Sequence, residues 1–126
     1  MAATTPIEHA TGHRSRTWKA TAGSGVALLV LVTVHMVAHH FVVEEVGGLR
    51  TYAQVLDYIA NPIIFVIEIL FLVVVTTHAM LGLRSVLFDF GLSTRAKRMV
   101  ARGLLVLGVV TVAYGVTLIS VLASRA

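Results

Sequence analysis

The chain has 126 residues, of which 57% are hydrophobic and 13% charged, and it carries a net charge of +4 and a mean hydropathy of +0.90. Because soluble domains are usually about a quarter charged, this composition excludes an ordinary soluble domain and predicts a membrane protein of one domain at most. The absence of cysteine excludes disulfides and iron–sulfur clusters held by this chain, and the position of the basic residues outside the apolar runs favours contact with the lipid bilayer over nucleic acid.

The first half of the chain predicts one membrane crossing. Residues 1–19 are polar and are expected to form a cytoplasmic tail. The apolar run over residues 20–43 exceeds the ~20 residues that a helix needs to cross the bilayer core, and no clear cleavage site follows it, so we interpret it as a retained transmembrane helix. Residues 44–60 are expected to form an outer loop that ends in a short interfacial helix over residues 52–60.

Two further crossings are predicted in the second half. The second transmembrane helix covers residues 61–84 and starts with an Asn-Pro pair, in which proline suits the first helical turn. A cytoplasmic loop is expected over residues 85–102 and a third, uncharged transmembrane helix over residues 103–123. Within it, Thr111 and Gly115 form a pair of small residues at the spacing that lets another helix approach closely.

Lysine and arginine are distributed unevenly between the two ends of the predicted helices. Three lie in the N-terminal tail and five between residues 83 and 102, whereas the first loop and the C-terminus hold one each. The positive-inside rule therefore places the N-terminus and the second loop in the cytoplasm. We expect an all-α, multi-pass protein of the cytoplasmic (inner) membrane. Three helices are too few to enclose a large cofactor, so partner helices are expected.

His78 is the first candidate functional residue, because an ionisable ring within the hydrocarbon is costly unless it has a partner. Gly82 follows at i+4, where it is expected to remove bulk beside the ring. Arg84 lies at the lipid boundary, where a guanidinium can bind an anionic group such as a heme propionate. The spacing alone leaves two interpretations open: a ligand of a flat cofactor, or a histidine bonded to a neighbouring helix with Gly82 serving close packing.

The histidines of the two predicted helices lie at different depths. With a rise of ~1.5 Å per residue, His35 lies in the outer half of the membrane, and His39 lies one turn further out on the same face. His78 lies near the cytoplasmic surface, some 15 Å from His35 in height. The two levels predict two hemes at an interface with another subunit rather than one heme held by both histidines.

Glu68 is the only acid within the apolar part of the second predicted helix, and it lies close to the level of His35. We predict that Glu68 hydrogen-bonds a histidine or takes part in proton transfer near the outer cofactor. The alternative is a protonated acid that is bonded to a nearby helix.

Two blocks of the sequence resemble the membrane-anchor (cytochrome b) subunits of succinate dehydrogenase. Residues 78–84 (HAMLGLR) and 89–91 (DFG) match the family pattern H-x-x-x-G-[IL]-R-x-x-x-x-D-[FY]. Ser24-Gly25, with His35 ten residues after the glycine, forms the second block. The resemblance implies three transmembrane helices packed with a second anchor subunit as a heme-binding helix bundle.

The resemblance also implies a function and a set of partners. A flavoprotein subunit with FAD would oxidise succinate, an iron–sulfur subunit would carry the electrons to a quinone, and this chain would be non-catalytic alone. His78 and His35, with His39 as the alternative to His35, would bind the iron of two b hemes shared with the other anchor, and Arg84 would face a propionate. Ser24 and Asp89 would at most line the quinone site.

The chain departs from the family at two positions near the quinone site. Many relatives have an arginine where this chain has Ala22, and some have a tyrosine where it has Phe90. We therefore expect the other anchor to supply most of the quinone site.

Two other functions remain as alternatives. Residues 35–40 read H-x-x-x-H-H, a spacing found in di-iron membrane desaturases, and histidines at i and i+4 can hold one metal ion. Such enzymes need several histidine boxes, and only His78 remains within the membrane. The other alternative is a cofactor-free structural subunit of a respiratory complex.

Overall fold

The structure, a computed structural model, describes residues 16–41 and 51–126, with side chains for residues 16–39 and 51–126. Most of the expected N-terminal tail and residues 44–50 of the expected outer loop lie outside the described residues. The described part is helical, with elements α1 (Arg16–Phe41), α2 (Tyr52–Ala60), α3 (Pro62–Asp89) and α4 (Thr94–Ala123). The helices α1, α3 and α4 are long and apolar enough to cross a membrane, which confirms the predicted fold class.

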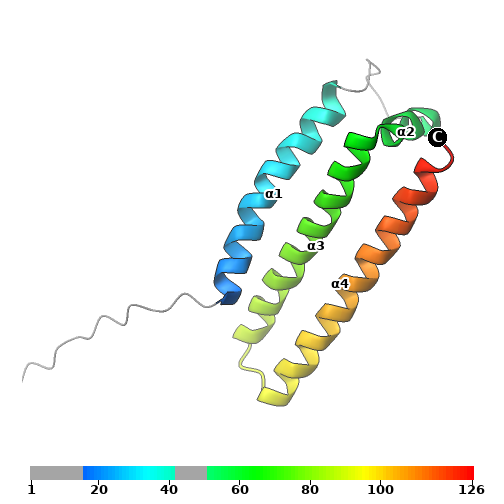
Figure 1. Cartoon of the computed structure of the whole chain (residues 1–126). Coiled ribbons are helices and arrows are strands. Elements are labelled where there is room, and N and C mark those ends of the chain that lie inside the picture. Colours follow the sequence, from blue (N-terminus) through cyan, green and yellow to red (C-terminus); the bar gives the residue numbers. More distant parts are fainter. Residues whose placement is uncertain (1–15, 42–50) are drawn as a thin grey trace, which may run out of the picture.

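The three long helices lie side by side, with α3 between α1 and α4, and α2 lies across one end (Figure 1). In the described part of the chain, α3 contacts every other helix, whereas α1 and α4 do not contact each other. Such a layer cannot bury both of its broad faces. Large apolar side chains along α1 and α4 are therefore exposed, among them Leu29, Leu105 and Tyr114.

The best-packed part of the molecule lies where α2 meets the long helices. Its buried residues come from α1, α2 and α3: Ala38, Tyr58, Ile59 and Ile64. Side chains near the end of α4, such as Ile119 and Leu122, pack against this core. The short helix α2, which the sequence predicted at residues 52–60, thus closes one end of the helix layer.

Local capping sets the helix boundaries at both ends of α3. Asn61 caps its start, because the side-chain oxygen accepts the N–H groups of Ile63 and Ile64. Gly91, with a φ of +70°, follows its end in a backbone conformation that favours glycine. Ser93 caps α4 by accepting the N–H of Ala96.

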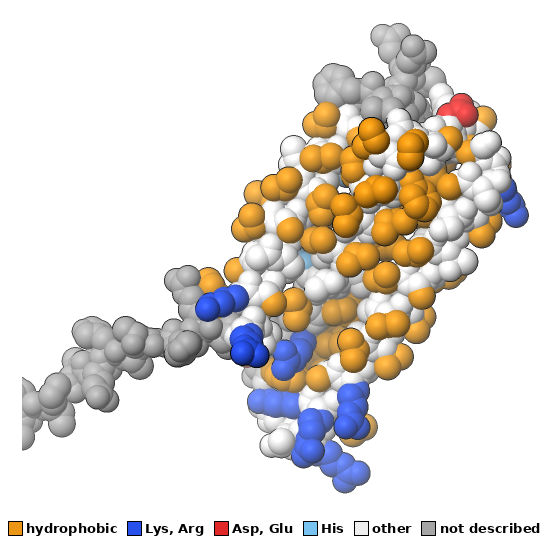
Figure 2. Space-filling view, viewed as in Figure 1, with side chains coloured by type: hydrophobic (Ala, Val, Ile, Leu, Met, Phe, Trp, Pro, Cys, Tyr) orange, Lys and Arg blue, Asp and Glu red, His pale blue; other side chains and the backbone are white. Residues whose placement is uncertain are grey.

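The connection between α3 and α4 is shorter than the predicted loop over residues 85–102. Only residues 90–93 are outside the two helices. The predicted loop was bounded by the ends of the apolar runs, whereas both helices continue beyond those runs into polar residues, as far as their capping residues. Figure 2 shows Lys and Arg side chains gathered at this end of the molecule, near the start of α1, with apolar side chains covering the long stretch toward α2. The basic character of this end is thus carried by helix termini.

Glycines of α4 allow α3 to approach closely. A Cβ atom at Gly108 would lie 3.2 Å from Met80, and one at Gly115 would lie 2.5 Å from Leu72. Gly115 therefore faces another helix, as the small-residue spacing predicted, and that helix is α3 of the same chain. Thr111 is exposed and bonds the carbonyl oxygen of Leu107 on its own helix, so Gly108 takes the place that the sequence assigned to Thr111.

Candidate functional site

His78 lies on α3 and turns its ring toward α1. Its Nδ1 atom is 3.1 Å from the Oγ atom of Ser24. A Cβ atom at Gly25 would lie 3.2 Å from Cε1 of the ring, so the absence of a side chain at Gly25 leaves the space that the ring occupies. The ring of His78 is thus held between a hydroxyl group and bare backbone of α1.

Gly82 does not lie beside this ring, contrary to the expectation from its i+4 spacing. A Cβ atom at Gly82 would meet no atom of the described residues within 4 Å. The reason is that side chains of a helix lean toward its N-terminus, so the ring of His78 covers the preceding turn. The glycine beside the ring of His78 is therefore Gly25 of α1, and the prediction that it is Gly82 of α3 was wrong. The pair Ser24-Gly25 in the sequence could have indicated this neighbour, since both residues lie against His78.

Arg84 lies six residues beyond His78 on α3. Its Nη1 atom donates a hydrogen bond to Oγ1 of Thr17 at 3.4 Å, and its guanidinium lies 4.8 Å from the centre of the Phe88 ring. Within the described part of the chain, its Nε atom is buried without a hydrogen-bond partner. Buried donors are nearly always paired, so this N–H is suited to an acceptor from outside the chain.

An open groove of about 750 Å³ runs between α3 and α4. Arg84 and Thr77 contribute polar groups to its wall, and apolar residues of α4 such as Leu104, Val109 and Val112 form most of the rest. Its size lies within the range of ligand pockets in proteins. Arg84 therefore contacts α1 through Thr17 and also lines the groove between α3 and α4.

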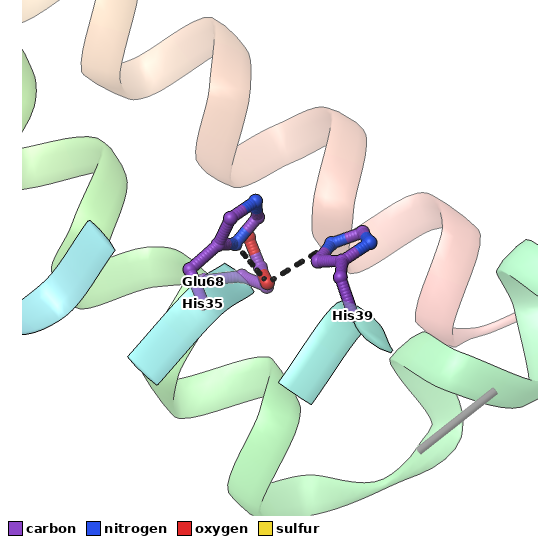
Figure 3. A group of neighbouring side chains, drawn as sticks. All are labelled: His35, His39 and Glu68. Carbon is purple, nitrogen blue, oxygen red and sulfur yellow. Dashed lines mark hydrogen bonds and ion pairs between the residues drawn. The ribbon is translucent and has the colours of Figure 1, made fainter. Parts of the chain in front are cut away.

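A second cluster lies near α2 and consists of His35, His39 and Glu68 (Figure 3). The Nδ1 atom of His35 is 2.8 Å from Oε1 of Glu68, and Nε2 of His39 is 3.7 Å from the same oxygen. Tyr58 donates its hydroxyl proton to that oxygen at 2.8 Å. The hydrogen bond between Glu68 and a histidine, one of the two alternatives predicted, is therefore present.

Aromatic contacts fix the orientation of the two rings. The ring of His35 stacks on Phe71 with a centre-to-centre distance of 4.8 Å and lies 4.2 Å from the ring of His39. The ring of His39 in turn lies 4.5 Å from Tyr58. Side chains from α1, α2 and α3 thus surround one partly buried carboxylate.

The two clusters lie at separate levels of the helix layer. His78 lies ten residues beyond Glu68 on α3, which corresponds to about 15 Å along the helix axis. On α1, His35 lies eleven residues beyond Ser24, or about 16 Å. The contacts therefore agree with the separation expected from the sequence, and one small ligand cannot contact both clusters.

Both rings use Nδ1 for a contact with the opposite helix. His35 of α1 bonds Glu68 of α3, and His78 of α3 bonds Ser24 of α1. No hydrogen bond among the described residues engages Nε2 of either ring. Histidines that bind metals through one nitrogen usually bond a protein group through the other. Both rings therefore have the arrangement expected of metal ligands.

The second cluster also resembles a site for a single metal ion. The ligand atoms of His35, His39 and Glu68 lie within 4.8 Å of one another, and this is the only such group of three in the part of the chain that the structure describes. Two histidines and one carboxylate are a known ligand set for iron. A di-iron centre needs more ligands than this cluster provides.

Asp89 and Ser24 are not brought together. Asp89 is exposed at the end of α3, eleven residues beyond His78 and thus about 16 Å further along the helix. Ser24 lies at the level of His78. These two residues, which the resemblance placed near a quinone, therefore lie at different levels of the layer.

Comparisons with known proteins point to one family. Residues 7–117 match the family described as the succinate dehydrogenase/fumarate reductase transmembrane subunit. A succinate dehydrogenase hydrophobic membrane anchor subunit of Thermoplasma acidophilum is 28% identical over 106 residues, 84% of each chain. A protein of the same description from Archaeoglobus fulgidus is 34% identical over 74 residues, 59% of this chain and 61% of that one. No solved structure matches the chain significantly.

Proposed function

Because the chain belongs to the succinate dehydrogenase/fumarate reductase transmembrane subunit family and is a membrane anchor subunit, we propose that it binds heme b through Nε2 of His78. The observation that carries this proposal is the bond between Nδ1 of His78 and Ser24, which leaves Nε2 as the nitrogen for iron. Heme supplies a one-electron carrier within the complex that passes electrons from succinate to quinone. The protein supplies the ligand, its orientation and the apolar surroundings.

Arg84 supports the same site, because heme carries anionic propionates at one edge. The buried Nε–H of Arg84 lacks a partner within the described residues, and a propionate would satisfy it in a charge-assisted hydrogen bond. Thr17 and Phe88 hold the guanidinium from α1 and α3. Gly82 leaves room on α3 for a flat ligand, because no group of the described residues lies within 4 Å of where its Cβ atom would stand.

We propose a second heme at the level of His35, as the two separate clusters suggest. His35 is the better candidate ligand of the two histidines on this face. Its Nδ1 atom bonds Glu68, so that its Nε2 atom remains for iron, whereas the Nε2 atom of His39 is directed at Glu68. Glu68, held in turn by Tyr58, would orient His35 and is the candidate group for proton transfer near this heme.

A second anchor subunit would complete both heme sites. That subunit would supply a further ligand to each heme, and the described residues leave the outer faces of α1 and α4 uncovered. We propose that the basic end of the layer lies in the cytoplasm and docks the iron–sulfur subunit, which receives electrons from the flavoprotein with FAD. The quinone would bind mainly to the other anchor, with Ser24 or Asp89 at its edge.

The purified complex tests the proposal. We expect b-type Soret and alpha bands that shift on reduction with dithionite, and we expect His78→Ala to remove one heme. The control Thr111→Ala changes an exposed residue of α4 that bonds only its own helix and does not line the groove, and it should leave the spectrum unchanged. Retention of both hemes in His78→Ala would refute the assignment of His78. A colourless complex would support the structural-subunit alternative, and non-heme iron without heme would support a metal ion at the cluster of His35, His39 and Glu68.

A further inference from the structure

A stripe of hydroxyl residues on α1 faces His78 and Arg84 of α3, the two residues that we place at the heme nearer the cytoplasm, called the inner heme below. Thr17, Thr21 and Ser24 recur at intervals of four and three residues, so they share one helix face. Thr17 accepts a hydrogen bond from Arg84, and Ser24 lies 3.1 Å from Nδ1 of His78. This hydroxyl stripe (Thr17, Thr21, Ser24) thus connects α1 to both residues.

The hydrogen bonds of Ser24 determine which way its contact with His78 runs. A serine hydroxyl has one proton to donate. The Oγ atom of Ser24 lies 2.9 Å from the carbonyl oxygen of Thr21, which can only accept, so the proton of Ser24 is used there. The hydroxyl oxygen must then accept from His78, and Nδ1 of His78 carries the proton. The Nε2 atom of the neutral ring is consequently unprotonated, as an iron ligand must be.

Gly25 adds a steric constraint to this electrostatic one. The ring atom Cε1 lies between Nδ1 and Nε2, and a Cβ atom at Gly25 would come within 3.2 Å of it, which is closer than ordinary van der Waals contact. Nδ1 is bonded to Ser24 and Cε1 lies against the backbone of Gly25. Rotation of the ring would therefore break the hydrogen bond to Ser24 or press the ring against Gly25. Nε2 is therefore aimed in one direction before any ligand binds.

From this geometry we infer that Ser24 is a positioning residue for His78, which sets the tautomer and the donor strength of the proposed heme ligand. The inference rests on the proposed heme site and gives Ser24 a role other than that of a quinone contact. An acceptor at Nδ1–H raises the basicity of the ligand nitrogen and thereby favours ferric iron. Loss of the Ser24 hydroxyl should raise the midpoint potential of the heme bound to His78 and weaken heme retention.

The matched pair Ser24→Thr and Ser24→Val isolates the hydroxyl, because threonine and valine have nearly the same shape. In the purified complex we expect the threonine variant to keep the wild-type midpoint potential of the heme that His78→Ala removes. We expect a higher potential and a 10–100-fold weaker heme affinity in the valine variant. A tenfold change in the preference for ferric over ferrous iron corresponds to about 59 mV for one electron.

Thr33→Ala is the control, since Thr33 bonds the carbonyl oxygen of Leu29 on α1 at an exposed position without contacting a histidine. It should leave both potentials unchanged. Equal potentials and heme contents in the threonine and valine variants would overturn the role of Ser24. Ser24→Ala covers the case in which the larger side chains prevent assembly, and a failure of all three Ser24 variants to assemble would assign Ser24 to packing instead. Absence of heme from the wild-type complex would overturn the proposed function itself.

Discussion

His78 and His35, which each bond a residue across the contact between α1 and α3, are held by chemically different groups. Nδ1 of His78 meets a neutral hydroxyl, whereas Nδ1 of His35 meets a carboxylate that also accepts from Tyr58. A carboxylate pulls the Nδ1 proton more strongly than a hydroxyl does, so it makes the ligand nitrogen more electron-rich. At the scale of single residues, the identity of this partner is the main difference between the two proposed heme ligands.

Glu68→Gln tests this difference, because glutamine retains an acceptor oxygen but lacks the negative charge. We expect the midpoint potential of the heme at His35 to rise by an amount on the order of 59 mV, the equivalent of a tenfold change in iron preference. The measurement is a redox titration of the two hemes in the purified complex.

Asp57→Asn is the control for Glu68→Gln, since Asp57 is an exposed acid on α2 outside the cluster. It should shift neither potential. A shift confined to the heme that His78→Ala removes would contradict the pairing of Glu68 with the outer site. Wild-type potentials in Glu68→Gln would show that the carboxylate does not tune either heme.

At the scale of the elements, the close approach of α1 and α3 is a requirement of the inner site. A Cβ atom at residue 25 would lie 3.2 Å from Cε1 of His78, so glycine at this position of α1 lets the ring lie there without being displaced. The approach differs from that of α3 and α4, where Gly108 and Gly115 accommodate the flexible side chains of Met80 and Leu72. A flexible chain can shift when a methyl group is added, whereas an imidazole bonded to Ser24 cannot do so freely.

Gly25→Ala should therefore displace the ring of His78 by a few tenths of an ångström and lower the heme content of the complex. Gly23→Ala is a closely matched control, because it adds the same methyl group two residues earlier on α1, where no atom of the described residues lies within 4 Å. Pyridine hemochrome assays of the two purified variants give the comparison. Equal heme contents in both variants would mean that the contact at Gly25 does not constrain the ligand.

At the scale of the whole molecule, the three long helices form an open layer rather than a closed bundle. Its centre, α3, is covered on two sides by α1 and α4, but the broad faces of the layer are not covered by the described residues. In a membrane such faces can contact lipid or helices of another subunit. Lys and Arg side chains gather at the end near the α3–α4 connection, whereas the end near α2 shows far fewer of them (Figure 2), so the two ends differ in the way that sets orientation.

The lack of cysteine makes this orientation directly measurable by single-cysteine labelling. We expect Arg95→Cys, exposed at the start of α4, to react with a membrane-impermeant maleimide only after the cytoplasmic membrane is permeabilised. Ala53→Cys, exposed on α2, should react in intact cells. The opposite labelling pattern would reverse the proposed orientation and move the docking surface of the iron–sulfur subunit to the other end.

Sequence by itself determined the helices and the residues of interest. Long apolar runs are a local property, and ionisable side chains within them are conspicuous because they are costly in hydrocarbon. His35, Glu68, His78 and Arg84 were found in this way, and the helical rise alone gave the spacing of the two levels.

Only the tertiary structure decided which helix faces meet. Transmembrane helices that are apolar all round carry no periodic signal of which side faces a neighbour. The rotation of α1 and α3 about their axes therefore depends on packing over their whole length. That rotation made Gly25 rather than Gly82 the neighbour of His78, gave Ser24 to the ring as its acceptor, and directed Nδ1 of His35 at Glu68.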